Sequence, residues 1–313
     1  MTEISIVVPV HNENKNIKPF LQRTENILDK MKKSYEIIFA LDPSSDNTEK
    51  IILDEIKRNK NIKLLVFSRR FGQPAATIAG ILNCKSSYCV IIDVDLQDPP
   101  EMIQELYNKI ISGYEVVYAK RKTRKGETFF KRIISSFGYF LINKLSDVHI
   151  PRDAGDYRII SRKVIDQLKE LNESHGFLRG MIAFVGFNQS YIEYDRDPRY
   201  AGKSKYNKFW GSLTIGLNGL IGFSSRPLFL MSIAGFIIAL MSFFLGVWYI
   251  IQKISGFNLT PGLTTTVILI TFFAGAQLLG LGLLGEYVGR IYDEVKKRPK
   301  YILDKKINFD EWI

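Results

Sequence analysis

The chain has 313 residues, of which 46% are hydrophobic and 24% are charged. This hydrophobic content excludes a disordered chain, and the length suffices for one large domain and a smaller one. The 43 Lys and Arg against 32 Asp and Glu give a formal net charge of +11, which suits nucleic acid, an anionic membrane surface or a phosphorylated substrate.

No sequence pattern supports a nucleic-acid-binding module or a zinc site. The chain has no RNA-binding aromatic signature, zinc-finger spacing or helix-turn-helix pattern, so no nucleic acid is expected among its partners. Cys84 and Cys89 lack metal-binding spacing and are expected to be reduced thiols in the core. His11, His149 and His175 share no ligand spacing either, so a bound metal would need oxygen ligands.

From residue 4 to about 120, short β-branched runs alternate with helical patterns. Strands separated by helices predict an α/β fold with a mostly parallel sheet covered on both faces. The predicted strands are "ISIVVPV" (4–10), "YEIIFAL" (35–41), "IKLLVF" (62–67), "YCVIID" (88–93) and "YEVVYA" (114–119). The predicted helices run from about Asn14 to Met31, from about Asn47, from Gln73 and after Pro99.

Each predicted strand ends in polar side chains. Ligands of parallel sheets bind outside the carboxyl ends of the strands, so these residues are expected to share one rim. They are Asn12 and Glu13, Asp42, Arg69 and Arg70, Asp93 and Asp95, and Lys120 and Arg121.

The stretch "CVIIDVDLQDPP" (89–100) places two carboxylates, Asp93 and Asp95, at the end of an apolar run and before a helix opened by Pro99 and Pro100. Such a pair suits a hard cation, Mg²⁺ or Mn²⁺, whose other ligands are water and phosphate oxygens. An Asp-x-Asp triplet is common by itself, and its position here makes it informative.

The composition changes after Arg226. Residues 228–251 and 263–285 carry no charge, and as a helix the first run would extend roughly 36 Å, enough to cross a bilayer. A buried hairpin of a soluble protein is the alternative, but two such runs in succession favour a transmembrane hairpin. Small-residue pairs, Ala276 to Gly280 and Gly285 to Gly289, would let helices approach closely, and a homo-oligomer through the membrane helices is expected.

Lys and Arg counting predicts the orientation of this hairpin. Lys253 alone lies between the two runs, whereas Arg226 precedes them and a basic stretch from Arg290 to Lys300 follows. Both termini and the N-terminal domain are therefore expected on the cytoplasmic side of an inner or plasma membrane, and no signal peptide is recognised. A segment at 205–225 with Lys205, Lys208 and Trp210 suits an interfacial helix on anionic lipids.

The chain resembles the family-2 glycosyltransferases of the GT-A fold, and among them the polyprenyl-phosphate glycosyltransferases such as bactoprenol glucosyltransferases and dolichol-phosphate mannose synthases. The matching blocks stand in the same order from about residue 4 to 301 and end in the same membrane hairpin. They are "SIVVPVHNE" (5–13), "LDPSSDNT" (41–48), "RRFGQPAATIAG" (69–80), "DVDLQDPPE" (93–101), "AGDYRIISRKV" (154–164) and "GEYVGRIYDEVKKRPKY" (285–301).

Four parts are expected along the chain on this basis. Residues 1–204 would form the cytoplasmic GT-A domain and 205–225 the amphipathic interfacial segment. Residues 226–289 would hold the two transmembrane helices, and 290–313 would be a basic cytoplasmic tail.

The resemblance implies that Pro9, Glu13 and Asp42 line the base and ribose pocket. It implies that Asp93 faces the nucleotide sugar, and that Asp95 with Gln97 holds the divalent metal. From the residues alone, Asp42 has an alternative role in a turn or helix cap, with Ser44, Asp46 and Thr48 competing for it. The family often has Asp-Asp-Gly-Ser or Asn-Asp-Gly-Ser where this chain has Leu-Asp-Pro-Ser at 41–44, a stiffer turn with one polar group fewer.

The resemblance marks Asp156 as the catalytic aspartate. A lipid phosphate, with a second pKa of about 6, is largely ionised at neutral pH and needs no general base, so Asp156 is expected to position the acceptor or tune local charge. A structural ion pair with Arg158 or Arg162 is the alternative. Cations expected to bind the phosphates are Arg121, Arg132, Arg199, Lys203 and Lys205.

The implied reaction is an inverting, metal-dependent transfer of a sugar from a nucleotide sugar, with UDP-glucose as the first guess, to polyprenyl (undecaprenyl) phosphate. Donors with N-acetylglucosamine, mannose or modified arabinose are alternatives. A processive glycan synthase is disfavoured because the chain has two spans and no Gln-x-x-Arg-Trp motif. A non-catalytic nucleotide-sugar sensor or flippase scaffold stays open, and a transport hairpin has little support because the spans carry no ionisable residue before Glu286.

Overall fold

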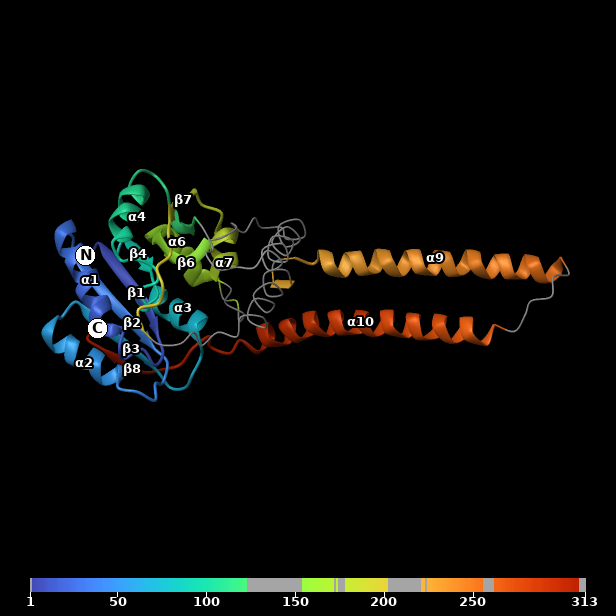
Figure 1. The fold of residues 1–313 in the computed structure, drawn as a ribbon, viewed down its shortest axis with the longest axis horizontal. Coiled ribbons are helices and arrows are strands. Elements are labelled where there is room, and N and C mark those ends of the chain that lie inside the picture. Colours follow the sequence, from blue (N-terminus) through green and yellow to red (C-terminus); the bar gives the residue numbers. More distant parts are fainter. Residues whose placement is uncertain are drawn as a thin grey trace.

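The computed structural model describes residues 2–122, 154–171, 173, 178–201, 221–222, 224–255 and 262–309. Within them, a sheet of eight strands has the order β7-β5-β6-β4-β1-β2-β3-β8 (Figure 1). The strands are β1 Ile4–Val10, β2 Tyr35–Leu41, β3 Ile62–Phe67, β4 Tyr88–Ile91, β5 Val116–Arg121, β6 Ala154–Ser161, β7 Gln189–Tyr194 and β8 Leu303–Ile307.

Most of the sheet is parallel, as predicted. β1 pairs in parallel with β2 and β4, β2 with β3, and β5 with β7, whereas β6 is antiparallel to both β4 and β5. Six strands therefore run in one direction, and β6 and β8 run against them. The carboxyl ends of the five strands predicted from the sequence, β1 to β5, all reach the same rim.

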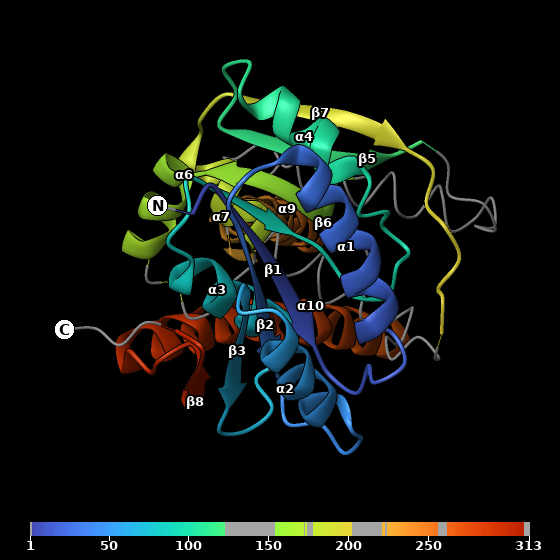
Figure 2. The same cartoon turned by 90° about the vertical axis from the view of Figure 1, so that its left-hand side faces the viewer.

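Helices cover both faces of the sheet (Figure 2). One core contains residues of α1 (Ile17–Met31), α2 (Thr48–Arg58) and α4 (Met102–Ile110), and the other contains residues of α3 (Gln73–Asn83), α6 (Arg162–Glu170) and α7 (Leu178–Val185). Side chains of β1 alternate between them, since Ile6 and Val8 belong to the first core and Val7 to the second. This burial on both faces explains why β1 is almost uniformly apolar.

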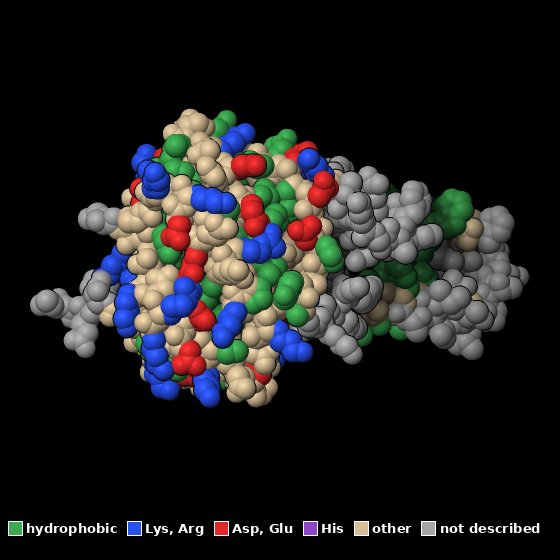
Figure 3. Space-filling view, turned by 60° about the vertical axis from the view of Figure 1, so that its left-hand side comes forward, with side chains coloured by type: hydrophobic (Ala, Val, Ile, Leu, Met, Phe, Trp, Pro, Cys, Tyr) green, Lys and Arg blue, Asp and Glu red, His purple; other side chains and the backbone are tan. Residues whose placement is uncertain are grey.

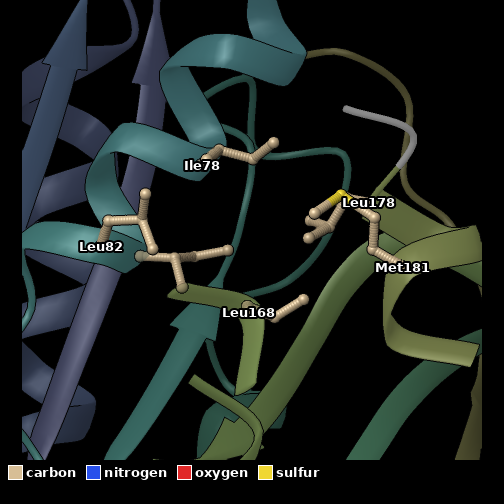
Figure 4. A pocket seen from close by; sticks show the side chains of 6 residues that line it. Ile78, Leu82, Leu168, Leu178 and Met181 are labelled. Carbon is tan, nitrogen blue, oxygen red and sulfur yellow. The ribbon is translucent and has the colours of Figure 1, made fainter. Parts of the chain in front are cut away.

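Helix α3 lies unusually close to the sheet. A Cβ atom added at Gly80 would lie 2.3 Å from Cγ1 of Val7, so glycine permits this approach. Between α3, α6 and α7 there remains a cavity of about 10 Å³, lined by apolar side chains only (Figure 4). It is at the lower limit for a single water molecule and is a packing defect rather than a ligand site. Figure 4 labels Ile78, Leu82, Leu168, Leu178 and Met181 around it.

Two long helices leave the domain side by side, α9 (Arg226–Ile254) and α10 (Leu263–Lys296) (Figure 1). Each contains a candidate membrane span by length and composition, at Arg226–Gln252 and Phe272–Lys296, and neither is buried by the rest of the protein. Large apolar side chains such as Phe236, Met241 and Leu279 are 69%, 68% and 77% exposed. An apolar surface of this extent calls for a lipid or protein environment. The predicted hairpin is present as two helices, and the second continues past residue 285 to Lys296.

The two helices touch where the sequence places one of its small-residue pairs. A Cβ atom at Gly280 would lie 2.2 Å from Cε of Met231 in α9, whereas a Cβ at Gly285 or Gly289 would meet no described atom within 4 Å. Near the domain, Oη of Tyr287 donates to the carbonyl of Ser224 at 2.7 Å. Among the residues that the structure describes, Gly280 and the base of the hairpin are thus two places where α9 and α10 meet.

The tail at 290–313, expected as a basic cytoplasmic extension, includes a strand that sequence analysis did not predict. Residues Leu303–Ile307 form β8, antiparallel to β3, with a register shift at Val66 and Phe67. Its sequence, LDKKI, has only its two terminal residues half-buried, so an alternating pattern is too short to recognise. Because β3 precedes the two helices and β8 follows them, the chain returns to the same sheet after α10.

Candidate active site

The loop after β4 carries the two carboxylates of the Asp-x-Asp triplet. Asp95 is buried, and its Oδ1 accepts the backbone N–H of Gln97 at 3.1 Å. Oδ1 of Asp93 accepts Nε2 of Gln73 at 2.8 Å. Burial is the largest cause that raises the pKa of Asp93 to about 8, and the carboxylates of Asp98 and Asp95 add to it. Burial also raises the pKa of Asp95. This loop thus gathers the three carboxylates of Asp93, Asp95 and Asp98, a ligand type that suits a bound divalent cation.

Asp98, to which no role was assigned from the sequence, ties this loop to β7. Oη of Tyr194 donates to Oδ1 of Asp98, and Nε of Arg196 lies 3.3 Å from the same oxygen. Nε of Arg121 in turn donates to Oη of Tyr194 at 3.5 Å. Asp98 therefore fixes the loop that carries Asp93 and Asp95.

Asp42 at the end of β2 binds the loop before α3. Its Oδ1 accepts the N–H of Phe71 at 2.9 Å and its Oδ2 accepts the N–H of Gly72 at 2.8 Å. Gly72 has φ of +89°, a conformation that favours glycine. The helix-cap alternative for Asp42 is wrong, since Asp46 is the residue whose carboxylate accepts the N–H of Thr48 at the start of α2, at 3.0 Å. The Asp42 carboxylate instead joins two rim loops.

Two carboxylates predicted for the site, Glu13 after β1 and Asp95 after β4, meet at the guanidinium of Arg199. Pro9 lies within β1, opposite Ala40 of β2. Oε1 of Glu13 lies 3.2 Å from Nη1 of Arg199, and Oδ2 of Asp95 lies 2.9 Å from Nη2 of the same guanidinium. Arg199, expected from the sequence to bind phosphate, thus bridges Glu13 and Asp95 at the carboxyl ends of β1 and β4.

The segment around Arg199 lies along the Asp-x-Asp loop. The N–H of Asp197 donates to the carbonyl of Gln97 at 3.1 Å, and the N–H of Tyr200 donates to the carbonyl of Asp95 at 3.2 Å. The Gln97 side chain, expected at the metal, donates its Nε2 to the carbonyl of Asp197 at 3.4 Å. These contacts, with the ion pairs Arg199–Asp95 and Arg196–Asp98, hold the two segments together.

Asp156 lies on β6 and pairs with an arginine that sequence analysis missed. Nε of Arg179 in α7 donates to Oδ1 of Asp156 at 2.8 Å, and Nη2 of Arg158 lies 4.0 Å from that oxygen. Burial alone would disfavour the ionised form, but Arg179 and Arg158 outweigh it and lower the pKa of Asp156 to about 2. Arg162, the other candidate partner, donates instead to the backbone carbonyls of Ser86 and Cys84.

Arg121 belongs to the same group of cations. Its guanidinium lies beside Gly155, next to Asp156 in β6: a Cβ atom added at Gly155 would lie 3.4 Å from Nη2 of Arg121. Burial lowers the pKa of Arg158 to about 10, which leaves this guanidinium protonated at neutral pH. The carboxylate of Asp156, 41% exposed, therefore contacts Arg179 of α7 and lies near Arg158 of β6, and the charge of Arg121 of β5 also lowers its pKa.

Several predicted residues lie outside the part of the chain that the structure describes. These are Arg132, Lys203 and Lys205, most of the 205–225 segment, and His149 and His175. Cys84 and Cys89 are buried free thiols, as predicted. On the face that Figure 3 shows, Lys and Arg are interspersed with Asp and Glu and form no continuous basic patch.

The comparisons with known proteins agree with this geometry. The pattern of Glycosyl transferase family 2 matches residues 5–169. An uncharacterised glycosyltransferase of Bacillus subtilis is 40% identical over 98% of this chain and 95% of that protein. An uncharacterised glycosyltransferase of Synechocystis is 39% identical over 96% and 94%. The bactoprenol glucosyl transferase of Shigella phage SfII is 39% identical over 97% of this chain and 98% of that protein.

Proposed function

This chain belongs to glycosyl transferase family 2 and is a glycosyltransferase, and on that premise we propose that its fold is GT-A and that it transfers a sugar from a nucleotide sugar to polyprenyl phosphate at the cytoplasmic face of a membrane. The observation that carries the proposal is the combination, in one chain, of an acidic rim, a group of arginines around Asp156 and an apolar hairpin. The relatives named for bactoprenol and glucosyl transfer support undecaprenyl phosphate as acceptor and UDP-glucose as the first donor to test.

The donor half of the site is built from the ends of β1, β2 and β4. Glu13 and Asp42 would bind the base and ribose beside Pro9, and Asp93 would face the sugar. Both oxygens of Asp42 already accept backbone N–H groups, so its orientation is set before the nucleotide arrives. Such preorganisation lowers the cost of binding.

A divalent cation, Mg²⁺ or Mn²⁺, fits the carboxylates of this loop. Burial, and then the carboxylates of Asp98 and Asp95, raise the pKa of Asp93, and a bound cation would favour its ionised form. Among the described residues, no three His, Cys, Asp or Glu side chains are grouped to hold a metal ion. The cation would bind Asp95, with Gln97, and take its further ligands from water and diphosphate oxygens. When bound, it would neutralise charge that develops on the leaving diphosphate.

The acceptor half is the group of arginines. The attacking oxygen of a phosphate monoester carries its own negative charge, so the protein needs cations to bring it near the sugar diphosphate. Arg121, Arg158 and Arg179 supply three, and Arg132, Lys203 and Lys205 are further candidates. Asp156, with a pKa of about 2, is a poor proton acceptor, which supports a role in orienting these arginines. Attack from the side opposite the diphosphate would invert the anomeric carbon.

The hairpin would place this site at the membrane. Since β3 and β8 belong to one sheet, the chain between them would cross the membrane an even number of times. The two apolar helices would provide two crossings. The Lys and Arg distribution favours the cytoplasm for the domain. The five residues from Lys296, at the end of α10, to Tyr301 can span at most about 17 Å. Because Tyr301 contacts Phe67 at the carboxyl end of β3, the rim lies close to the base of the hairpin.

The test is product formation by the purified full-length protein. It would be given undecaprenyl phosphate, Mg²⁺ or Mn²⁺, and a panel of radiolabelled nucleotide sugars, with and without a chelator. We expect one lipid-linked sugar that disappears with the chelator. Nucleotide-sugar binding without any product would overturn the proposed reaction and favour a sensor or scaffold that has kept the family fold.

A further inference from the structure

The segment that follows the membrane hairpin packs against the donor side of the sheet. The ring of Tyr301 contacts the ring of Phe67 at the end of β3, with centroids 5.9 Å apart and planes at 75°. Phe67 in turn contacts Phe71, at 6.0 Å and 59°. We call these three side chains the aromatic row. It links the residue five positions beyond α10 to the loop between β3 and α3.

Backbone contacts reinforce this link. The N–H of Ser68 donates to the carbonyl of Ile302 at 3.0 Å, so the loop after β3 is paired with the tail for one residue beyond the strand. The Tyr301 hydroxyl accepts Nδ2 of Asn83, at the end of α3, at 3.3 Å. Nζ of Lys300 donates to the carbonyl of Leu171, just after α6, at 2.5 Å. Tail residues 300–302 thus contact the loop after β3, the last residue of α3 and the residue after α6.

The loop at the other end of the aromatic row orients two donor-site carboxylates. Phe71 and Gly72 give their N–H groups to Asp42, and Gln73, the first residue of α3, gives its side-chain N–H to Asp93. A displacement of Phe71 would move both amides away from Asp42. Small misplacements of positioning groups cost binding and rate disproportionately.

We propose that Tyr301, in the segment that returns from the membrane hairpin, is a positioning residue of the donor site: through the aromatic row it holds the Phe71–Gln73 loop that orients Asp42 and Asp93. Tyr301 touches no reacting group itself. The inference rests on the proposed function for the statement that Asp42 and Asp93 bind a nucleotide sugar. This role of Tyr301 couples the membrane hairpin to donor binding, because residues 297–301 connect the end of α10 to the aromatic row.

The first test does not depend on any ligand. Hydrogen–deuterium exchange of the full-length protein in detergent would be compared for wild type, Tyr301→Ala and Tyr301→Phe. We expect faster exchange over residues 68–73 in Tyr301→Ala, by roughly tenfold for the amides bound to Asp42, and little change in Tyr301→Phe, which keeps the ring. Tyr301→Leu replaces the alanine variant if the latter does not fold.

A matched control loosens the tail at its other end. Nδ2 of Asn308 donates to the carbonyls of Lys60 and Ile62, at the start of β3 and away from the aromatic row. Asn308 has φ of +63°, so Asn308→Gly removes these bonds without backbone strain. We expect Asn308→Gly to lower the melting temperature and leave exchange at 68–73 unchanged. Equal exchange increases in Asn308→Gly and Tyr301→Ala would overturn the proposal, since the tail would then only stabilise the sheet.

The second test measures binding of UDP-glucose with Mg²⁺ by calorimetry in the same variants. We expect Tyr301→Ala to weaken Kd roughly tenfold, with Tyr301→Phe and Asn308→Gly near wild type. An unchanged Kd in Tyr301→Ala alongside faster exchange would overturn the coupling to donor binding. Failure of wild type to bind or use any nucleotide sugar would instead contradict the proposed function, and the exchange result would still decide whether Tyr301 holds the loop.

Discussion

At the scale of single residues, two carboxylates of this site differ in their surroundings and should differ in their response to substitution. Asp95 is buried and its pKa is raised by that burial, while Arg199 and the N–H of Gln97 partly compensate its charge. Asp156 has its pKa lowered to about 2 by arginines. Asp95 shares the guanidinium of Arg199 with Glu13, whereas Asp156 has Arg179 in contact and Arg158 nearby.

Replacing Asp95 by asparagine should abolish most of the activity and leave the fold intact. The substitution keeps the side-chain volume and removes a costly buried charge. We expect turnover to fall by a factor of at least about 100, because the charge on the departing diphosphate loses its stabilisation. The measurement is lipid-linked product formed per minute, with Asp54→Asn on the exposed face of α2 as the control. Turnover within threefold of wild type would contradict the assignment of Asp95.

The pH dependence of Asp156→Asn tests whether this residue is a base. With a pKa of about 2, the wild-type carboxylate stays ionised throughout the working range, so any loss of kcat/KM toward acid should come from the acceptor phosphate, near pH 6. We expect Asp156→Asn to lower kcat/KM by roughly 10- to 100-fold and to keep that acid limb in place. An acid limb that disappears in the variant would identify Asp156 as the general base.

The same shift has a consequence for stability. The pKa of Asp156 in the folded state lies below its ordinary value of 3.8. Its ion pair with Arg179 therefore stabilises the fold above about pH 4, and this contribution is lost as the pH falls toward 2. Thermal unfolding of wild type and Arg179→Gln should differ at pH 6 and converge at low pH.

At the scale of elements, contacts between helices depend on where glycine permits close approach. Gly80 lets α3 lie against β1, and Gly280 lets α10 lie against α9. Sequence analysis singled out the Ala276–Gly280 and Gly285–Gly289 pairs alike, and the structure places only Gly280 of these glycines in contact with α9 among the described residues. Helix orientation decided between the pairs, because it sets which face of α10 meets α9.

Replacing Gly280 by leucine should weaken the hairpin. The nearest atom is Cε of Met231, the mobile end of a flexible side chain, so a methyl group would be accommodated but a leucine side chain would not. We expect a loss of roughly 1–3 kcal/mol in the free energy of unfolding, measured by thermal denaturation in detergent. Gly282→Leu, where an added Cβ meets no described atom within 4 Å, is the matched control and should be close to neutral. Equal effects of both substitutions would contradict the contact.

At the scale of the whole molecule, the sheet constrains the membrane topology. A strand before the hairpin and a strand after it are hydrogen-bonded to each other, so a hairpin that spans a bilayer would have both of its ends on one side. This argument is independent of Lys and Arg counting and agrees with the orientation that the counting predicts. Tyr287 joins the two helices at their base, and the pairing of β8 with β3 ties the segment after α10 to the sheet.

Cysteine labelling in intact cells tests this arrangement. Gly262→Cys, between α9 and α10, should react with a membrane-impermeant maleimide from outside. Asp304→Cys in β8, whose side chain at this position is 55% exposed, should react only after the cells are permeabilised. The native cysteines are buried and should contribute little background. Labelling of Asp304→Cys in intact cells would reverse the proposed orientation.

The sequence by itself determined that the first strands run parallel, that polar residues gather at their carboxyl ends, and that two apolar helices follow. These features follow from local periodicity and composition, which act over a few residues. For example, β1 and β2 have the predicted bounds, and Asp93 and Asp95 lie in the loop directly after β4, as predicted.

Only the tertiary structure decided which charges meet. Arg179 and Asp156 are 23 residues apart, Arg199 and Glu13 are 186 apart, and Tyr301 meets Phe67 across the whole hairpin. No local pattern encodes such pairs, because the energy that selects them comes from burying several elements at once. The short β8 strand shows the same limit, since its pairing with β3 rather than its own propensity makes it a strand.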